Sequence, residues 1–220
     1  MRFLDRLMKG RRPETYTEEE LDAVESHIDR FFGHVDNVFH ELASPDIHVD
    51  IEIVEPTPER NFYTLVTVGM GAHRMNVDKD LREYGLERAE LLICLPPDWD
   101  IKSDEERWYW PIRWLKIMAR VPIDERSWVG YGHTASDGVR FAENTGFTAV
   151  MAVMPKSFGE ESGSCAMPGG GTVNFYQLLP LFDDELDLKS ASCAEDLEDL
   201  FGKRGVGPVV DVARRSVCRV

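Results

Sequence analysis

The stretch from Pro56 to Gly71 reads PTPERNFYTLVTVGMG, which is a proline-bounded turn, a strand and a glycine-rich corner. Phe62 to Val68 forms the strand, and its mixed pattern indicates burial on both faces, as for a central strand of a sheet. Thr64 and Thr67 are its polar exceptions, and we expect their hydroxyl groups to satisfy neighbouring backbone groups. Gly69 permits the corner. We therefore expect the sheet to be built around this strand.

Helical and strand-like segments flank this strand on both sides. Thr17 and Glu20 form a capping-box pattern for a helix that Gly33 ends, and Pro111 suits the first position of another helix. The expected strands are 38–42, 47–53, 89–95, 147–154 and 172–179, and the expected helices are 15–32, 111–120 and 185–201. This order predicts a single α+β domain with a mixed or antiparallel sheet flanked by helices. Residues 159–171, rich in Gly, Ser and Pro, look like the most mobile loop.

Charge is distributed unevenly along the 220 residues. The net charge is −15, yet residues 1–12 carry +4 and residues 214–220 carry +3, so the body between them carries −22. Such a body repels nucleic acid and attracts a basic protein. The plain alternative is that acidity keeps the protein soluble.

The sequence also indicates a compartment. No apolar run approaches the ~20 residues that a membrane helix needs, and the basic first segment, in which a short amphipathic helix is conceivable, lacks the apolar core of a secretory signal. The chain contains four cysteines, at 94, 165, 193 and 218, which show no C-x-x-C pair and no dense disulfide spacing. We expect a cytoplasmic protein that contacts no membrane.

Catalytic and cofactor motifs are incomplete in this chain. The run that begins at Gly69 has Arg74 where a dinucleotide-binding loop needs its third glycine, and residues 169–172 lack the Lys-Ser/Thr of a phosphate loop. His48, Asp50 and Glu52 share one side of an expected strand, where we expect a solvated face rather than a metal site. The sequence thus predicts no catalytic residue, no metal and no cofactor.

Aromatic residues are dense around Trp110. Trp108, Trp110 and Trp114 lie within seven residues, with Tyr109 among them. Side chains of this size dominate both cores and interfaces. Trp108 and Trp110 are therefore either core residues or partner contacts.

An ordered series of short segments resembles the bacterial branch of the suppressor of fused family over about residues 30–190. The segments are PTPER at 56–60, FYTLVTVGM at 62–70, RAEL at 88–91, LPPDW at 95–99, WPI at 110–112, MAR at 118–120, Trp128, GYGHT at 130–134 and VNFYQLLPL at 173–181. The resemblance implies a mixed α/β domain that binds proteins without catalysis, and for a bacterial member an immunity protein that neutralises a toxin. The animal members have a further C-terminal domain that this chain is too short to contain, so their peptide clamp is not carried over.

With this resemblance, the chain divides into a basic segment at 1–14, a suppressor-of-fused-like domain at 15–205 and a C-terminal tail at 206–220. His133 is the foremost candidate for a partner contact, with Trp128 and Tyr131 beside it. The expected partner is another protein, and an acidic body suits a basic toxin.

Two other hypotheses remain. An enzyme of unrecognised type would use His133, His73 or Cys165 with nearby carboxylates, and these groups would share a pocket and have perturbed pKa values. A nucleic-acid mimic would present an elongated acidic surface with regularly spaced carboxylates. Oligomeric state does not follow from the sequence.

Overall fold

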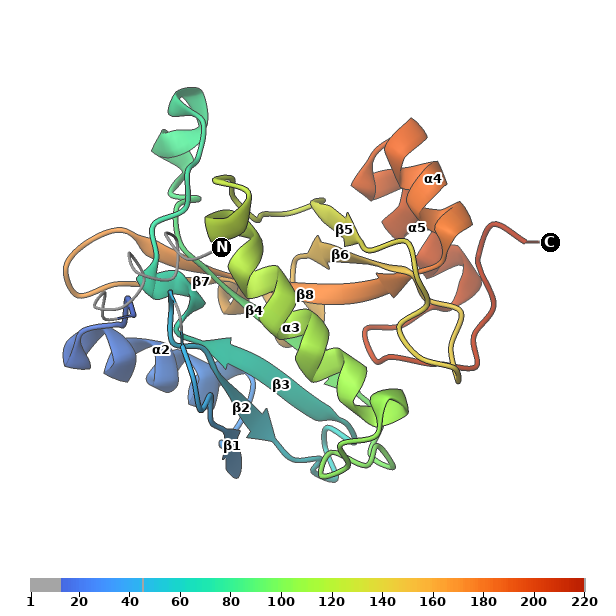
Figure 1. The fold of residues 1–220 in the computed structure, drawn as a ribbon, viewed down its shortest axis with the longest axis horizontal. Helices are drawn as coiled ribbons and strands as arrows, with labels where there is room; N and C mark the ends of the chain where they lie inside the picture. Colours follow the sequence, from blue (N-terminus) through green and yellow to red (C-terminus); the bar gives the residue numbers. More distant parts are fainter. Residues whose placement is uncertain (1–12, 45, 220) are drawn as a thin grey trace, which may run out of the picture.

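A computed structural model of the chain describes residues 13–44 and 46–219 (Figure 1). The amphipathic helix considered for the basic N-terminal segment falls outside these residues. None of the helices within them is both long enough and apolar enough to cross a bilayer.

One eight-stranded sheet forms the centre of the molecule. Its strands are β1 (Asn37–Phe39), β2 (Asp50–Val54), β3 (Tyr63–Val68), β4 (Ala89–Leu95), β5 (Thr134–Ser136), β6 (Ala149–Val153), β7 (Ser164–Ala166) and β8 (Thr172–Leu181). They are ordered β1-β2-β3-β4-β8-β6-β5, and β7 also pairs with β8. The β4–β8 pairing is parallel and the other pairings are antiparallel. The predicted mixed sheet and α+β class are confirmed.

Helices cover both faces of the sheet (Figure 1). They are α2 (Glu18–Phe31), α3 (Glu106–Asp124), α4 (Asp183–Ala191) and α5 (Ala194–Arg204), and four short 3-10 turns are η1 (Met70–Ala72), η2 (Lys79–Tyr84), η3 (Lys156–Phe158) and η4 (Glu160–Gly163). Alternation along the strands divides the core: in β4, Leu91 and Ile93 pack in the cluster under α3, whereas Leu92 packs in the cluster under α2. On the face that carries α2, the other half of the sheet is covered by α5.

The C-terminal segment closes the space between α2 and α5. Val209 bridges to Cys94 of β4, and the side-chain amide of Gln177 in β8 donates to the carbonyl oxygen of Pro208 at 2.6 Å. The segment predicted as a tail therefore lies against the two central strands. Whether residues 14 and 205 are the true boundaries of the domain stays a prediction.

A buried carboxylate, Glu90 in β4, holds the glycine corner at the end of β3. Its exposed fraction is 0 %, and it accepts hydrogen bonds from the Tyr16 hydroxyl (2.6 Å), the Thr67 hydroxyl (2.6 Å) and the backbone N–H groups of Gly69 (2.9 Å) and Gly71 (3.0 Å). Burial raises the pKa of Glu90, and these hydrogen bonds oppose that rise. The stretch 56–71 thus ends on a corner whose backbone N–H groups donate to a buried carboxylate.

The two strand threonines behave differently. The Thr67 hydroxyl accepts the N–H of Leu91 at 2.8 Å while it donates to Glu90, so the expectation that it serves a backbone group is confirmed. The Thr64 hydroxyl is buried and has no hydrogen-bond partner among the described residues, so the same expectation is wrong there. Of the two, only Thr67 serves a backbone group, and Thr64 lies opposite Cys94 of β4.

The helix expected at 111–120 is longer, because α3 begins at Glu106 and contains both Pro111 and Pro122. A proline inside a helix removes one backbone hydrogen bond. The buried side chains of Trp110, Trp114 and other residues pack on the sheet and offset this loss. The start of α3 is therefore set by packing against the sheet and not by Pro111.

The expectation of a mobile loop at 159–171 is wrong for its middle. Residues 160–166 form η4 and β7, and Cys165 pairs with Val173 of β8. Cys165 and Met167 are buried under α2, which fixes this segment. The open glycines at 169–171 remain a hairpin connection.

An ion pair fastens the C-terminal segment to α4. Glu185 is fully buried, and its two oxygens accept bonds from Arg214 at 2.6 and 2.7 Å. The Arg214 guanidinium also lies over the rings of Phe147 and Phe182, each at 4.8 Å. Glu185 further accepts the N–H of Val217 at 2.9 Å. The pair thus anchors residues 214–217 below α4.

We expect Gly69→Ala to destabilise the protein by at least about 4 kcal/mol. Gly69 has a φ of 119°, and an added Cβ would lie 1.9 Å from the carbonyl oxygen of His48. Gly170→Ala is the matched control, because Gly170 has a φ of 86° but open space around it, and it should cost only about 1 kcal/mol. Chemical denaturation measures both; equal losses would show that the close approach at Gly69 has no effect.

We expect Arg214→Met to destabilise the protein by about 3–5 kcal/mol, because it leaves the buried Glu185 carboxylate without its cation. The double variant Glu185→Leu with Arg214→Met should lose less than the single variant, since no buried charge remains. Urea unfolding compares the two. A double variant less stable than the single one would contradict this account.

Candidate interaction surface

The residues predicted to contact a partner fall into two groups at opposite ends of α3. Trp108 and Trp110 lie in its first turns, whereas Trp128, Tyr131 and His133 follow its end at Asp124. A helix of 19 residues is about 28 Å long. The five residues therefore do not form one site.

The first group is mostly structural. Trp110 is fully buried and packs against Trp99 and Phe141, with ring centroids 5.9 and 5.2 Å apart. Trp108 is half-buried, its ring meets Trp99 edge-on at 5.2 Å, and its carbonyl oxygen accepts the Trp99 indole N–H. Trp110 therefore offers no surface to a partner in this structure, and Trp108 offers part of one ring.

The second group is tied to α5. The Tyr131 hydroxyl donates to Glu198 at 2.6 Å, and Glu198 also pairs with Lys156 at 3.1 Å. The ring of His133 lies 4.2 Å from that of Trp128, and its Nδ1 is 3.0 Å from the Trp128 carbonyl oxygen. Burial lowers the pKa of His133. Trp128, Tyr131 and His133 are half-buried, and their contact with a partner stays a prediction.

His133 and Cys165 do not meet. Cys165 lies opposite Val173 near the start of β8, whereas Thr134, next to His133, pairs through Met151 of β6 with Leu179. Six residues along a strand span about 20 Å. Burial also raises the pKa of the Cys165 thiol, which disfavours the reactive thiolate. These two residues therefore cannot act together on one substrate atom.

An apolar surface lies at the open edge of the sheet, where β1 has no further strand beside it among the described residues (Figure 1). Large exposed apolar side chains gather there, and we call these four the edge surface: Val38, Phe39, Leu42 and Ile117. Leu42 is the most exposed, at 99 %. Val38 and Phe39, adjacent in β1, point to opposite faces of the sheet. Exposed apolar residues beside an unpaired strand are typical of protein-binding sites.

Phe39 joins the two elements of the edge surface. Its ring centroid lies 6.1 Å from that of Tyr109 on α3, and the Lys116 ammonium lies over it at 4.7 Å. Ile117 lines a groove along α3 together with Tyr109 and Lys116, the two residues that contact Phe39. The edge surface is therefore shared by a strand and a helix that are far apart in the sequence.

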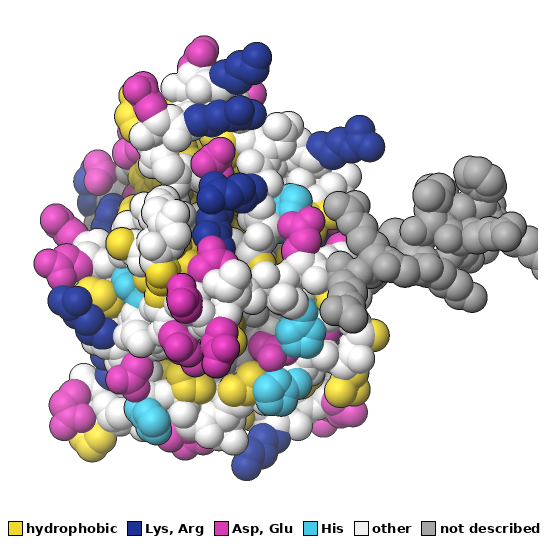
Figure 2. Space-filling view, turned by 90° about the vertical axis from the view of Figure 1, so that its left-hand side faces the viewer, with side chains coloured by type: hydrophobic (Ala, Val, Ile, Leu, Met, Phe, Trp, Pro, Cys, Tyr) yellow, Lys and Arg dark blue, Asp and Glu magenta, His cyan; other side chains and the backbone are white. Residues whose placement is uncertain are grey.

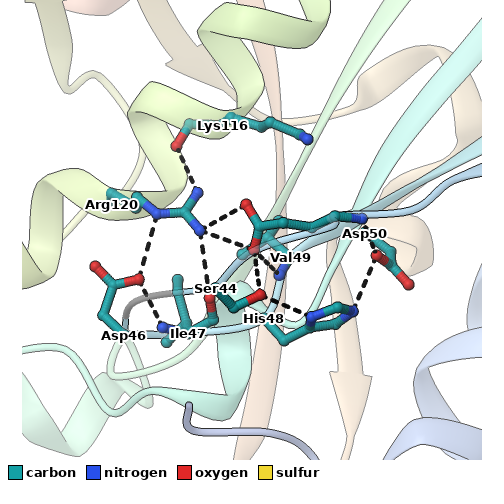
Figure 3. Close-up of polar contacts among 9 residues, drawn as sticks. Ser44, Asp46, Ile47, His48, Val49, Asp50, Lys116 and Arg120 are labelled. Carbon is teal, nitrogen blue, oxygen red and sulfur yellow. Dashed lines mark hydrogen bonds and ion pairs between the residues drawn. The ribbon is translucent and has the colours of Figure 1, made fainter. Parts of the chain in front are cut away.

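A polar network fixes the connection between β1 and β2 to α3 (Figure 3). Arg120 donates to both oxygens of Glu41, at 2.7 and 2.9 Å. Glu41 accepts the Ser44 hydroxyl, which is 2.8 Å from Nδ1 of His48, and Nε2 of His48 is 3.1 Å from Asp50. Since each member contacts the next, the segment that carries Leu42 is held in place.

Asp50 ends this network. It accepts the backbone N–H of Glu41 at 2.8 Å, and its second oxygen is 2.9 Å from Nδ1 of His40. Burial raises the pKa of Asp50, but these hydrogen bonds and the two histidine rings outweigh that effect and hold it below its usual value. Among the described residues, no group of His, Cys, Asp and Glu is arranged to hold a metal ion.

Glu52 contradicts the solvated face expected for 47–53. It lies in β2 between Val38 and Val66, under α2, and only 5 % of it is exposed. Burial and the nearby Glu25, Glu90 and Asp50 raise the pKa of Glu52 to about 7. Residues 47–53 alternate as expected, but α2 covers the face of the strand on which we expected solvent.

Acidic side chains occupy the outer side of α2. Glu18, Asp22, Glu25 and Asp29 are exposed and recur at intervals of four, three and four residues, which places them along one side of the helix. We call these four the α2 stripe. Figure 2, which views the molecule from the left-hand side of Figure 1, shows carboxylates and histidines close together across its middle and lower parts.

The sequence matches the model of one known protein family. The model of the suppressor of fused protein family matches residues 45–215, which is most of the chain. The chain belongs to the suppressor of fused family. This confirms the resemblance seen in the sequence, and the family is one of protein-interaction domains.

Bacterial and animal proteins are both similar to this suppressor of fused chain. An uncharacterised protein of Ureaplasma parvum is 27 % identical over 202 residues, which cover 91 % of this chain and 96 % of that protein. A suppressor of fused homologue from Neisseria gonorrhoeae has a TM-score of 0.65 at 22 % identity, covering 91 % of this chain and 98 % of that one.

Two further solved structures share the suppressor of fused fold. One is a Sufu–Fu complex, with a TM-score of 0.67, 16 % identity and coverage of 94 % of this chain and 93 % of that one. The other is Drosophila Suppressor of Fused, with a TM-score of 0.60 and 16 % identity, of which this chain spans 54 %.

Sequence reasoning missed the edge surface. A signal was present, because Val38 and Phe39 are adjacent apolar residues in a short strand and must point to opposite faces. Leu42 lies between Glu41 and Ala43, at the end of the strand expected at 38–42. The contribution of Ile117 could not be seen, since it depends on how α3 crosses the sheet.

We expect Glu52→Gln to stabilise the protein at pH 8 by up to about 3 kcal/mol, and to have little effect near pH 5. The folded-state pKa of about 7 lies above the ordinary value of 4.5, so folding favours the protonated form. That contribution is complete below the ordinary pKa and is lost as pH rises through 7, and glutamine cannot ionise. Urea unfolding at several pH values measures this, with the exposed Glu59→Gln as control; parallel curves for the two variants would contradict it.

Proposed function

We propose that this chain binds another protein without catalysing a reaction, and that the partner is a basic toxin that the chain neutralises. Membership of a family of protein-interaction domains supports the first part. The observation that carries the proposal is the edge surface, a set of exposed apolar residues at a braced strand–helix junction.

The contacts that hold the edge surface in position favour binding there. Arg120 ties Glu41 to α3, and the Lys116 and Tyr109 side chains hold Phe39. A partner therefore meets Phe39 in a preformed position and does not have to order it, which lowers the entropic cost of association. Apolar anchors in such positions carry most of the free energy of binding at protein interfaces.

Charge supports a basic partner. The described chain without its C-terminal arginines is strongly acidic, and carboxylates flank β1: Asp36 accepts the N–H of Glu55, and Glu55 accepts the side chain of Asn37. The α2 stripe extends this charge along the neighbouring helix. Carboxylates on the β1 and α2 side of the edge surface speed encounter with a basic protein, whereas Lys116 and Arg120 lie on its α3 side.

The test begins with a photo-crosslinking amino acid at Leu42 in the native host, which identifies the partner. We then expect Phe39→Glu with Leu42→Glu to weaken its binding by about 2 kcal/mol or more. Val139→Glu is the matched control, because Val139 is a large apolar residue exposed elsewhere, and it should leave the affinity unchanged. Isothermal titration calorimetry measures both, and equal losses would remove the edge surface from the interface.

The basic-toxin part has its own test. Replacing the α2 stripe by its amides (Glu18→Gln, Asp22→Asn, Glu25→Gln and Asp29→Asn) should lower the association rate about tenfold at low salt and leave dissociation nearly unchanged. Co-expression should protect cells from the partner. A partner that is acidic or harmless would overturn the toxin proposal and leave the binding role standing.

A further inference from the structure

A pocket lies between the end of α5 and the C-terminal segment. Its volume is about 340 Å³, and its walls come from β8, from the last turn of α5 and from residues 205–219. This is at the small end of the size range for pockets that bind small molecules. It lies across the sheet from the edge surface, so it is separate from the proposed protein interface.

The floor of the pocket is apolar. Phe201, Val210 and Val217 line it and are almost completely buried, and Leu179 of β8 lies beside them. An apolar floor favours a ligand with an aliphatic or aromatic body. It gives no advantage to small, strongly hydrated anions such as inorganic phosphate, which have no apolar surface to bury there.

The rim of the pocket is cationic, although the protein as a whole is acidic. Four arginines line it: Arg204, Arg214, Arg215 and Arg219. Glu185 forms an ion pair with Arg214, and Asp184 forms one with Arg219 at 3.1 Å. Arg204 and Arg215 are exposed and have no ion-pair partner among the described residues.

One carboxylate, Asp211, also lines the pocket, and one of its oxygens accepts the N–H of Ala213 at 2.9 Å. The pocket lining thus holds two guanidinium groups without an ion-pair partner among the described residues and one carboxylate, a net charge of about +1 that favours one further negative charge. A guanidinium binds a carboxylate through two parallel hydrogen bonds, a geometry that suits a single terminal carboxylate.

We propose that this pocket binds a carboxylate attached to a branched aliphatic or aromatic group. The apolar body would lie on Phe201 and Val217, and the carboxylate would meet Arg204 and Arg215. A free carboxylic acid and the last residue of a peptide share this chemistry. The Glu185–Arg214 ion pair holds the Arg214 side of the pocket in place without a ligand.

The test uses four probes: 4-methylpentanoate, its amide, acetyl-Gly-Gly-Leu with a free carboxylate, and the same peptide as an amide. Each is titrated to about 10 mM into the ¹⁵N-labelled full chain at low salt, and binding is read from backbone amide shifts. We expect an acid to shift the signals of residues 201–217 and its amide to bind at least about tenfold more weakly. Binding by 4-methylpentanoate indicates a free acid as ligand, and binding by the peptide acid alone indicates a chain terminus.

Variants locate the site. Arg204→Ala with Arg215→Ala should weaken the binding of the acid at least about tenfold. Arg74→Ala with Arg140→Ala is the matched control, because it removes the same net charge from two exposed arginines elsewhere and should change nothing. Absence of shifts with both acids, equal binding of acid and amide, or shifts outside the pocket would each overturn the proposal. The comparison of acid with amide on the unaltered protein needs no variant to fold.

Discussion

The carboxylate of Glu90 has to be satisfied inside the protein, and much of the fold follows from how this is done. Removing a charged group from water costs several kcal/mol unless donors replace the water. Four donors do so here, from Tyr16, from Thr67 in β3 and from the backbone of Gly69 and Gly71. The corner can approach Glu90 only because glycine at 69 passes closely over His48, two residues before β2 begins. One side chain therefore sets the relative positions of the segment before α2 and of strands β2, β3 and β4.

Local patterns in the sequence were sufficient for the central elements. The capping box at Thr17 formed as expected, and β3 and β4 lie within a residue of their predicted bounds, because burial on both faces leaves a continuous apolar run. Features that depend on packing at a distance were not visible. The first turn of α3, the burial of Glu52 and the pairing of β7 all follow from what lies across the sheet, which one segment of sequence does not specify.

The candidate site likewise combines features that the local sequence shows with features that depend on packing between distant segments. Aromatic density drew attention to Trp108 and Trp110, but density does not separate a core from an interface, and α3 turns Trp110 fully inward. The edge surface combines β1 with Ile117 from α3, and its firmness depends on the Arg120–Glu41 pair between segments 79 residues apart. Its components are ordinary in the sequence, and only the three-dimensional arrangement brings them together.

Residues 206–217 are translated after every strand of the sheet, yet Val209 pairs with the central strand β4 and Arg214 reaches the buried Glu185. On the ribosome, the earlier strands can associate while this part of the sheet is still uncovered. A chain cut short near residue 205 would leave Gln177 and the backbone of Cys94 open to solvent and would bury Glu185 without its cation. A copy without residues 206–217 therefore lacks this brace and is more exposed to chaperones and proteases.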